Sequence, residues 1–298
     1  MLRSVVKVVR VVPVVRDVPV VAVVRVIVLV LVALVLPVTM LVSPLVASAA
    51  QEEPSRPSSM AALGDSITQA ADVCCWYGDH PTSSWSTGSS PDDGVLSHYE
   101  RLVSLQPAIA GHGSNNAVTG AQASGLPRQV SLALAQKPDY VTILIGANDL
   151  CTSSTLTMTS TADFTTQVSS ALAALHQGLP QAKIFVSSIP NIHQLWSVLR
   201  GSWVARTVWS TAGVCQSMLA SANTDETRQQ VVSREAAFNQ ILSSACAQYS
   251  QCRWDGYATY NLAFSASQVS TLDYFHPNRS GQAALAQVTW NASFWGSR

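Results

Sequence analysis

Two short segments near opposite ends of the chain carry the residues that could do chemistry. Gly64-Asp65-Ser66-Ile67-Thr68 places a serine hydroxyl directly after a short apolar run. Asp273-Tyr274-Phe275-His276-Pro277 supplies an imidazole with a carboxylate three residues before it. Serine is a weak nucleophile until a base removes its proton, and that base needs a partner that fixes its tautomer and stabilises its charged form. The chain therefore contains the three groups that acyl transfer through a serine requires.

Apolar runs alternate with helical patterns along the chain, which is typical of βαβ units and a parallel sheet. We expect strands at 60–63, 140–145 and 183–189, and helices at 164–177, 235–249 and 281–290. The pattern predicts an α/β fold, a three-layer α/β/α sandwich with a mostly parallel central sheet. Ligands bind such sheets at the carboxyl ends of the strands, so Ser66 and Asn148, which each follow a strand, should meet at one edge.

Four blocks occur in a fixed order: Gly64-Asp65-Ser66, Asn116-Ala117-Val118-Thr119-Gly120, Gly146-Ala147-Asn148-Asp149 and Asp273-Tyr274-Phe275-His276-Pro277. Together they resemble the SGNH (GDSL-type) hydrolase family, named for its Ser, Gly, Asn and His. The resemblance covers residues 60–298 and implies a flavodoxin-like SGNH hydrolase domain there. It also implies that Ser66 is the nucleophile, that His276 is the general base, and that Asp273 orients His276.

The same resemblance implies an oxyanion hole made by the backbone N–H groups of Ser66 and Gly120 and the side-chain amide of Asn148. The physical chemistry agrees, because a tetrahedral intermediate places negative charge on the former carbonyl oxygen and preorganised donors stabilise it. An amide donates without titrating, and glycine lets the backbone approach closely. This chemistry needs no cofactor and no metal.

Each residue also has a structural interpretation. Ser66 alone could be a helix N-cap, and His276 alone could be a structural histidine, but the four blocks together favour catalysis. The other histidines have no matched carboxylate, so we expect them in loops or on the surface: His80, His98, His112, His176 and His193. The aromatic cluster of Trp76, Tyr77 and Trp85 either walls an acyl or sugar pocket or only packs on the domain, and the sequence favours neither.

The N-terminal segment has the pattern of a secretory signal peptide. Residues 1–25 carry five basic residues and one acid, residues 26–46 carry no charge, and Ala47-Ser48-Ala49 fits a signal peptidase site. The alternative is an uncleaved membrane anchor, since 21 uncharged residues could span a bilayer. Pro37 and Pro44 weaken a continuous helix, so we favour a signal peptide at 1–49, a polar tether at 50–59 and secretion without a stable membrane anchor.

The charge of the expected mature chain excludes one class of partner. Removal of residues 1–49 leaves twelve basic and sixteen acidic residues, a net charge near −4. A nucleic-acid-binding surface would carry a basic stripe, so we expect no nucleic-acid partner. The remaining length suits a single domain with a sizeable core, and we expect a monomer.

All six cysteines follow the signal segment, and an even number in an exported chain suggests three disulfides. A zinc site is the alternative, but no CxxC pair and no histidine cluster favours it. The short loop between Cys246 and Cys252 makes them the first expected pair, and Cys151 with Cys215 is the second. Cys74 and Cys75 remain as the third pair, which would strain the backbone between neighbours.

These observations predict a secreted serine hydrolase that cleaves carboxylic esters, lipid or other acyl esters, through an acyl-enzyme. A carbohydrate acetylesterase is the alternative within the same chemistry. A second hypothesis from another class is a non-catalytic cell-surface binding protein held by an uncleaved N-terminus.

Overall fold

The structure is a computed structural model that describes residues 55–296, so the expected signal segment lies outside the described residues. Within the expected tether, Ser58 donates its backbone N–H and its hydroxyl to the Asp139 carboxylate, over 2.8 and 2.6 Å. Among the described residues, none of the helices is both long enough and apolar enough to cross a membrane.

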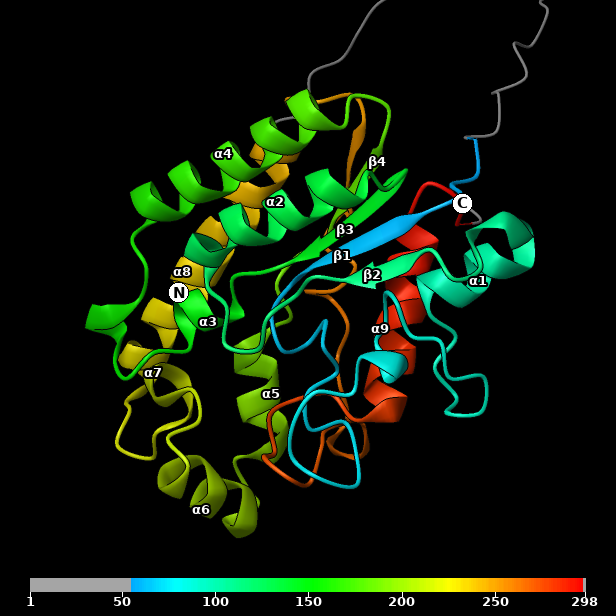
Figure 1. Ribbon diagram of the computed structural model, residues 1–298. Helices are drawn as coiled ribbons and strands as arrows, with labels where there is room; N and C mark the ends of the chain where they lie inside the picture. The colour runs from blue at the N-terminus through cyan, green and yellow to red at the C-terminus, as the bar shows by residue number, and fades with distance from the viewer. Residues whose placement is uncertain (1–54, 297–298) are drawn as a thin grey trace, which may run out of the picture. The chain divides into compact units, whose positions relative to one another are not determined.

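A five-stranded parallel sheet forms the centre of the domain (Figure 1). The strand order is β2-β1-β3-β4-β5, and every neighbouring pair is parallel. The strands are β1 (Met60–Gly64), β2 (Gly113–Asn115), β3 (Tyr140–Leu144), β4 (Lys183–Val186) and β5 (Cys252–Trp254). All residues of β1 and β3 are buried, as is expected where both faces of a parallel sheet are covered.

Helices cover both faces of the sheet (Figure 1). They are α1 (His98–Leu105), α2 (Leu126–Gln136), α3 (Ala147–Leu150), α4 (Thr161–Gly178), α5 (Ile192–Leu199), α6 (Trp203–Thr211), α7 (Gln216–Leu219), α8 (Asp225–Cys246) and α9 (Arg279–Ala292). Figure 1 shows α2, α4 and α8 over one face of the sheet and α1 and α9 over the other, while α3, α5, α6 and α7 lie to one side of it. This arrangement confirms the predicted three-layer α/β/α fold.

The strand register brings the carboxyl ends of the central strands to one edge. Gly64 of β1 pairs with Leu144 of β3, and Ile143 pairs with Val186 of β4. The predicted strands at 140–145 and 183–189 end earlier than expected, because the chain leaves the sheet there to form loops at this edge. Ser66 follows β1 by two residues and Asn148 follows β3 by four, so both lie at this edge, as predicted.

The helix predicted at 235–249 has different ends in the structure, where α8 spans Asp225–Cys246. Its first two turns are polar, which hides the apolar periodicity from a reading of the sequence. The Thr224 side chain accepts a hydrogen bond from Thr227 N, and Asp225 and Glu226 lie in the first turn, where the helix dipole favours negative charge.

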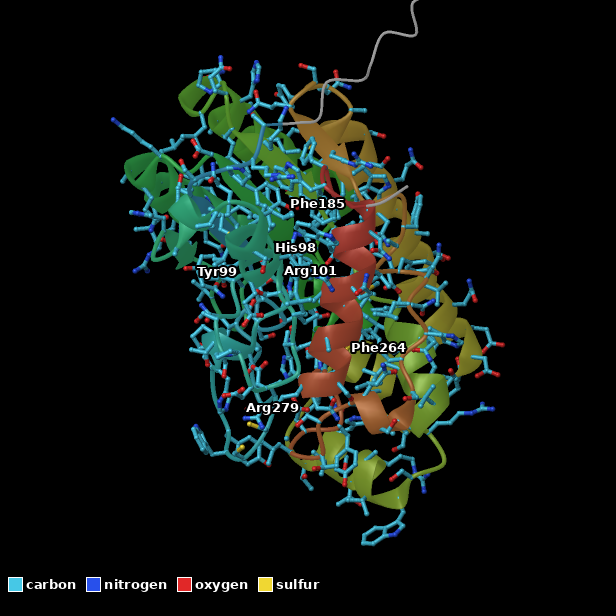
Figure 2. The ribbon with its side chains drawn as sticks, turned by 90° about the vertical axis from the view of Figure 1, so that its right-hand side faces the viewer. His98, Tyr99, Arg101, Phe185, Phe264 and Arg279 are labelled. Atoms are coloured by element: carbon cyan, nitrogen blue, oxygen red, sulfur yellow. A yellow bond between two sulfur atoms is a disulfide. The ribbon has the colours of Figure 1, made fainter. Side chains whose placement is uncertain are left out.

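His98 is fully buried, so the expectation that it lies in a loop or on the surface is wrong. Its ring nitrogens hydrogen-bond the Tyr140 hydroxyl at 3.0 Å and the Thr289 hydroxyl at 2.9 Å. Figure 2 shows it beside Phe185, with 5.6 Å between the ring centroids. Burial, helped by the charge of Arg101, lowers the pKa of His98 to about 3, which keeps the ring neutral. Two hydroxyl partners are enough to satisfy a neutral imidazole in the core.

Candidate active site

Ser66 lies in a tight turn that follows β1. The Asp65 main-chain oxygen accepts hydrogen bonds from Thr68 N and Gln69 N, each with an N···O distance of 3.1 Å. The Asp65 carboxylate Oδ1 accepts a hydrogen bond from Ile67 N at 3.0 Å. Gly64 has φ +153°, and a Cβ there would lie 2.4 Å from the Leu144 oxygen, so only glycine fits at the start of the turn. The turn therefore fixes the Ser66 backbone, while the side chain reaches the edge of the sheet.

His276 links Ser66 to Asp273. Its Nε2 lies 2.7 Å from Ser66 Oγ, and its Nδ1 hydrogen-bonds Asp273 Oδ2. A carboxylate only accepts, so Nδ1 carries the proton and Nε2 is the acceptor that faces the serine hydroxyl. Asp273 Oδ1 accepts from Phe275 N at 2.9 Å and from His276 N at 3.1 Å, so one carboxylate orients both the ring and its loop. The structure thus joins the three predicted residues in one hydrogen-bonded chain.

The interaction between His276 and Asp273 moves the pKa values of these two residues apart. Burial alone would lower the pKa of His276, but the hydrogen bond and charge of Asp273, with the charges of Asp72 and Asp65, raise it above 6.5. Burial alone would raise the pKa of Asp273, but its hydrogen bonds and the His276 charge lower it below 3.8. An aspartate that stays ionised beside a basic imidazole is the arrangement that suits proton removal from a serine.

Asp65 is a buried acid beside the serine. Burial raises its pKa to about 7, against the hydrogen bond from Ile67 N and the charge of His276. Its Oδ2 has no hydrogen-bond partner among the described residues. Its other contacts hold the turn that carries Ser66, which agrees with a bracing role rather than a chemical step.

Of the two other predicted donors, Gly120 lies in the loop after β2 and Asn148 lies in α3, which follows β3. Asn116 N donates to the Ala62 oxygen (2.8 Å) and Val118 N donates to the Gly64 oxygen (3.2 Å), which attach the loop after β2 to the end of β1. Gly120 in this loop is exposed and has φ +80°, a conformation that favours glycine. The Asn148 side chain donates one N–H to the Ala121 oxygen at 3.1 Å. The structure therefore joins Asn148 to the loop of Gly120.

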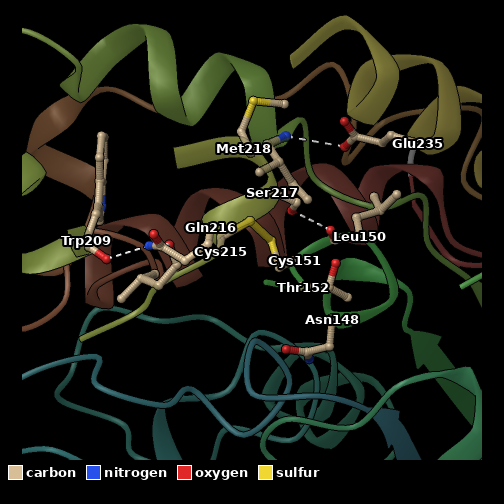
Figure 3. The surroundings of a disulfide bond; sticks show 12 residues. Asn148, Leu150, Cys151, Thr152, Trp209, Cys215, Gln216, Ser217, Met218 and Glu235 are labelled. Atoms are coloured by element: carbon tan, nitrogen blue, oxygen red, sulfur yellow. Dashed lines mark hydrogen bonds between the residues drawn. A yellow bond between two sulfur atoms is a disulfide. The ribbon is translucent and has the colours of Figure 1, made fainter. Parts of the chain in front are cut away.

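A disulfide between Cys151 and Cys215 anchors the helix of Asn148 (Figure 3). Cys151 follows α3 directly, and the Ser217 hydroxyl donates to the Leu150 oxygen over 2.6 Å. A second disulfide joins Cys246 and Cys252, so both of these pairs are the ones expected.

The expected third disulfide is absent from the described residues. Cys74 and Cys75 are both free, with their sulfurs 2.6 Å apart and no bond between them. Cys75 has φ +65°, so the backbone between the two neighbours is already in an unfavourable region without a bond. Both cysteines lie in the loop Asp72–Gly78, which follows the turn of Ser66.

Asp72 is a residue of the site that the sequence did not reveal. Its Oδ2 lies 3.9 Å from His276 Nδ1, although no motif and no spacing marks it. Asp72, Asp273 and His276 also form a cluster that could hold a metal by distance alone. Both nitrogens of His276 are engaged in hydrogen bonds, to Ser66 and Asp273, so we interpret the cluster as a hydrogen-bonded His276–Asp273 pair with the Asp72 carboxylate nearby.

An apolar pocket lies beside Ser66, Asn148 and His276. Neighbours of each predicted site residue line it: Ile67 beside Ser66, Ala147 beside Asn148, and Phe275 and Pro277 on both sides of His276. The remaining wall is Pro190, Asn191, Ile192, Leu195, Phe264 and Val269. The cavity volume is about 30 Å³. The pocket is therefore larger than the space that a single water fills.

Two buried side chains of α8 hold the α5 wall of this pocket. Glu235 Oε1 accepts from Ile192 N at 3.3 Å, and Asn239 Oδ1 accepts from Ile189 N at 2.8 Å. Burial raises the pKa of Glu235 well above its usual value, against the effect of that hydrogen bond. Neither residue belongs to a recognisable motif, and sequence reasoning missed both.

Comparison with known proteins decides the family. The sequence profile of the GDSL-like Lipase/Acylhydrolase family matches residues 60–288. The chain belongs to this family. The resemblance inferred from the four blocks is confirmed, and membership supports ester hydrolysis as the reaction class. No curated protein sequence matches the chain significantly.

The structure is also similar to solved structures of other proteins. A candidate GDSL-like lipase from Parabacteroides merdae is 17% identical, with a TM-score of 0.52 over 78% of this chain and 94% of that one. Phospholipase A1 from Streptomyces albidoflavus is 17% identical, with a TM-score of 0.47 over 79% and 99% of the two chains. The Clostridium thermocellum family 3 carbohydrate esterase is 13% identical, with a TM-score of 0.46 over 78% and 92%. At 17% identity and a TM-score of 0.52, the likeness to the Parabacteroides merdae protein concerns the fold alone.

Proposed function

We propose that this GDSL-family chain is a secreted carboxylic-ester hydrolase that works through a Ser66–His276–Asp273 triad. The observation that carries the proposal is the continuous hydrogen-bonded chain from Ser66 Oγ through the His276 ring to the Asp273 carboxylate. It contains a nucleophile, a base that accepts the nucleophile's proton, and an acid that fixes the tautomer of the base.

The reaction follows from these contacts. Ser66 Oγ attacks the ester carbonyl carbon while its proton passes to His276 Nε2. The tetrahedral intermediate breaks down when the alcohol leaves with that proton, and an acyl group remains on Ser66. Water, activated by His276, then attacks the acyl carbon and releases the acid. The N–H groups of Ser66 and Gly120 and the second N–H of the Asn148 amide would donate to the oxyanion.

The apolar pocket is the proposed acyl site, because residues adjacent to all three catalytic segments line it. Its small volume favours short acyl groups among the lipid and other acyl esters that the family chemistry allows. A carbohydrate acetylesterase is the second candidate. Besides the small pocket, the exposed Trp76 and Tyr77 favour it, since flat aromatic faces can bind sugar rings, and the Tyr77 hydroxyl donates to the oxygen of Leu272, next to Asp273.

A Ser66→Ala variant tests the reaction. We expect it to lose turnover of nitrophenyl acetate and labelling by a fluorophosphonate, with an unchanged unfolding midpoint. An exposed serine, Ser153, offers the matched control as Ser153→Ala. If Ser66→Ala kept most of the activity, the triad would be wrong. A folded wild-type protein that neither labels nor turns over would instead favour a non-catalytic binding protein.

A substrate panel separates the two candidates. Nitrophenyl esters from acetyl to palmitoyl, acetylated xylan and a phospholipid should be compared by kcat/KM. The small pocket predicts the highest value for acetyl and a steep fall beyond butanoyl. A rising value with chain length, and activation by phospholipid vesicles, would contradict the short-acyl proposal.

Secretion and the start of the mature chain need a test of their own. The proposal is that the signal ends at Ala49, so N-terminal sequencing of protein recovered from the medium should begin at Ala50. A full-length chain retained in the membrane fraction would support an uncleaved anchor instead.

A further inference from the structure

Two carboxylates approach the same nitrogen of His276. Asp273 Oδ2 hydrogen-bonds Nδ1, and Asp72 Oδ2 lies 3.9 Å from it. Both acids are mostly shielded from solvent, with 10% and 16% of the side chains exposed. Charges that are partly buried at this separation interact more strongly than exposed pairs, because solvent and salt screen them less.

The backbone around Asp72 is built so that one oxygen stays directed at the imidazole. Asp72 Oδ1 accepts from Gly78 N at 2.7 Å, and Asp72 N donates to the Gly78 oxygen at 2.8 Å. The Ser270 hydroxyl donates to the Asp72 main-chain oxygen, which fastens this loop to the segment that precedes Asp273. Asp72 also has φ +54°, a conformation that a non-glycine residue rarely adopts. These contacts engage Oδ1 and the backbone and leave Oδ2 facing His276.

We propose that Asp72 is a second carboxylate partner of His276, a positioning residue that stabilises the imidazolium formed when Ser66 loses its proton. The inference rests on the proposed triad function. It assigns the closed loop Asp72–Gly78 a part in the reaction, since that loop sets the position of the second carboxylate. Asp72 lies near Nδ1, while Ser66 lies at Nε2 on the other side of the ring, so Asp72 acts through His276.

Three acidic groups influence the charge of His276, and the test must separate them. Asp273, Asp72 and Asp65 all favour the protonated ring, while burial opposes it. Asp273 and Asp65 stay in place when Asp72 is changed. A shift in the pH profile of an Asp72 variant therefore reports the charge of Asp72.

Asp72→Asn is the main variant, because its amide oxygen can still accept from Gly78 N while the charge is gone. We expect the acid limb of kcat/KM to move to lower pH by a few tenths to about one pH unit, since the His276 pKa falls when an opposite charge is removed. We also expect kcat to fall by about tenfold with KM nearly unchanged. Asp92→Asn is the matched control: Asp92 is exposed, the charge lost is the same, and the profile should not move.

A double-mutant cycle with Asp273 adds a second readout. Because both acids approach one nitrogen, their effects should be non-additive. Asp72→Asn should reduce kcat more in an Asp273→Asn background, where it removes the remaining carboxylate partner of Nδ1, than in the wild type.

The outcomes separate this inference from the proposed function. Activity in Ser66→Ala would overturn the triad itself. Loss in Ser66→Ala, together with an unmoved acid limb in Asp72→Asn and additive effects in the cycle, would overturn only the role of Asp72. If Asp72→Asn fails to fold, Asp72→Ser keeps a short acceptor for Gly78 N and should show the same shift; an unmoved limb there overturns the inference equally.

Discussion

The side-chain amide of Asn148 donates to the main-chain oxygen of Ala121, 3.1 Å away, and this bond joins α3, which follows β3, to the loop after β2. One of its two N–H groups is used in the contact, and its direction fixes the other. Both predicted donors outside the Ser66 turn, Gly120 and Asn148, are thus held by one local interaction. In the proposed oxyanion hole, this bond would hold the two donors in place before a substrate binds.

Asn148→Ala should lower kcat by about 10²–10³-fold with a much smaller change in KM, because the lost donor acts mainly on charge that develops in the transition state. Steady-state kinetics on nitrophenyl acetate measure both constants. Asn261→Ala, at an exposed loop position, is the control and should match the wild type. An unchanged kcat in Asn148→Ala would remove this residue from the oxyanion hole.

The pH profile of the wild-type enzyme should show its acid limb above pH 6.5, because the pKa of His276 is raised and the ring must be neutral to accept the Ser66 proton. Initial rates of kcat/KM between pH 5 and pH 10 locate this limb. A limb well below pH 6.5 would mean that the surrounding carboxylates do not control the base.

His276 and Asp273 both contribute to folding stability, but their contributions depend on pH in opposite directions. The raised pKa of His276 contributes stability that is fully present below pH 6.5 and is lost as the pH rises through the folded-state pKa. The lowered pKa of Asp273 contributes stability that is present above pH 3.8 and is lost as the pH falls through its folded-state pKa. Urea unfolding of Asp273→Asn against the wild type should therefore show its largest difference near pH 5, where both contributions are present, and a smaller difference at pH 3, below the usual pKa of an aspartate.

His98 should make the fold sensitive to acid. Its pKa is about 3 in the folded state and near 6.5 unfolded, so the unfolded chain binds a proton first and stability falls as the pH drops below 6.5. At pH 5 this loss is about 2 kcal/mol. Urea unfolding of His98→Gln should give a lower but flatter stability between pH 5 and pH 8. His112→Gln, at an exposed site, is the control and should keep the wild-type dependence of unfolding free energy on pH. If the free energy of His98→Gln fell as steeply with pH as that of the wild type, His98 would not be the source of the acid sensitivity.

Removal of the Cys151–Cys215 disulfide should cost stability and activity together. It closes a loop with a sequence separation of 64, against 6 for Cys246–Cys252, and a longer loop loses more chain entropy. We expect a loss of about 2–4 kcal/mol for Cys151→Ala with Cys215→Ala, and a smaller loss for the matched double variant of the short loop. Only the first should lower kcat, because only that disulfide adjoins the helix of Asn148.

Leu195→Ala should widen the acyl pocket. Leu195 is nearly buried at its wall, so truncation leaves space for a longer chain at a cost of about 2–5 kcal/mol in stability. The ratio of kcat/KM for butanoyl over acetyl ester should rise. Val198→Ala lies on the same helix but is 37% exposed, and its ratio should not change. If this ratio did not change in Leu195→Ala, the pocket would not determine which acyl groups the enzyme accepts.

Some features could be predicted from the sequence because they are local. The turn of Ser66 needs Gly64 and Asp65 beside it, and the spacing of Asp273 and His276 lets one carboxylate hold both its own loop and the ring. The continuous apolar runs of β1 and β3 mark strands that are buried on both faces, so the parallel sheet and its active edge followed from them.

Other features depended on which distant segments met. His98 is isolated in sequence, and only the packing of β3 and α9 around it supplies its hydroxyl partners and excludes water. The start of α8 could not be predicted because its first turns are polar and show no apolar periodicity. Arg228 and Glu235 are nevertheless buried, and tertiary contacts account for their burial.

The sequence by itself therefore determined the family, the layered fold and the serine, histidine and aspartate of the proposed triad, since short-range spacing and hydrophobic pattern encode them. Only the tertiary structure decided that Asp72 faces the same imidazole nitrogen as Asp273, and that neighbours of Ser66, Asn148 and His276 line one apolar pocket. The reason is physical: a left-handed backbone at Asp72 and the bonds from Gly78 and Ser270 direct that carboxylate, and these contacts join segments that no local pattern relates.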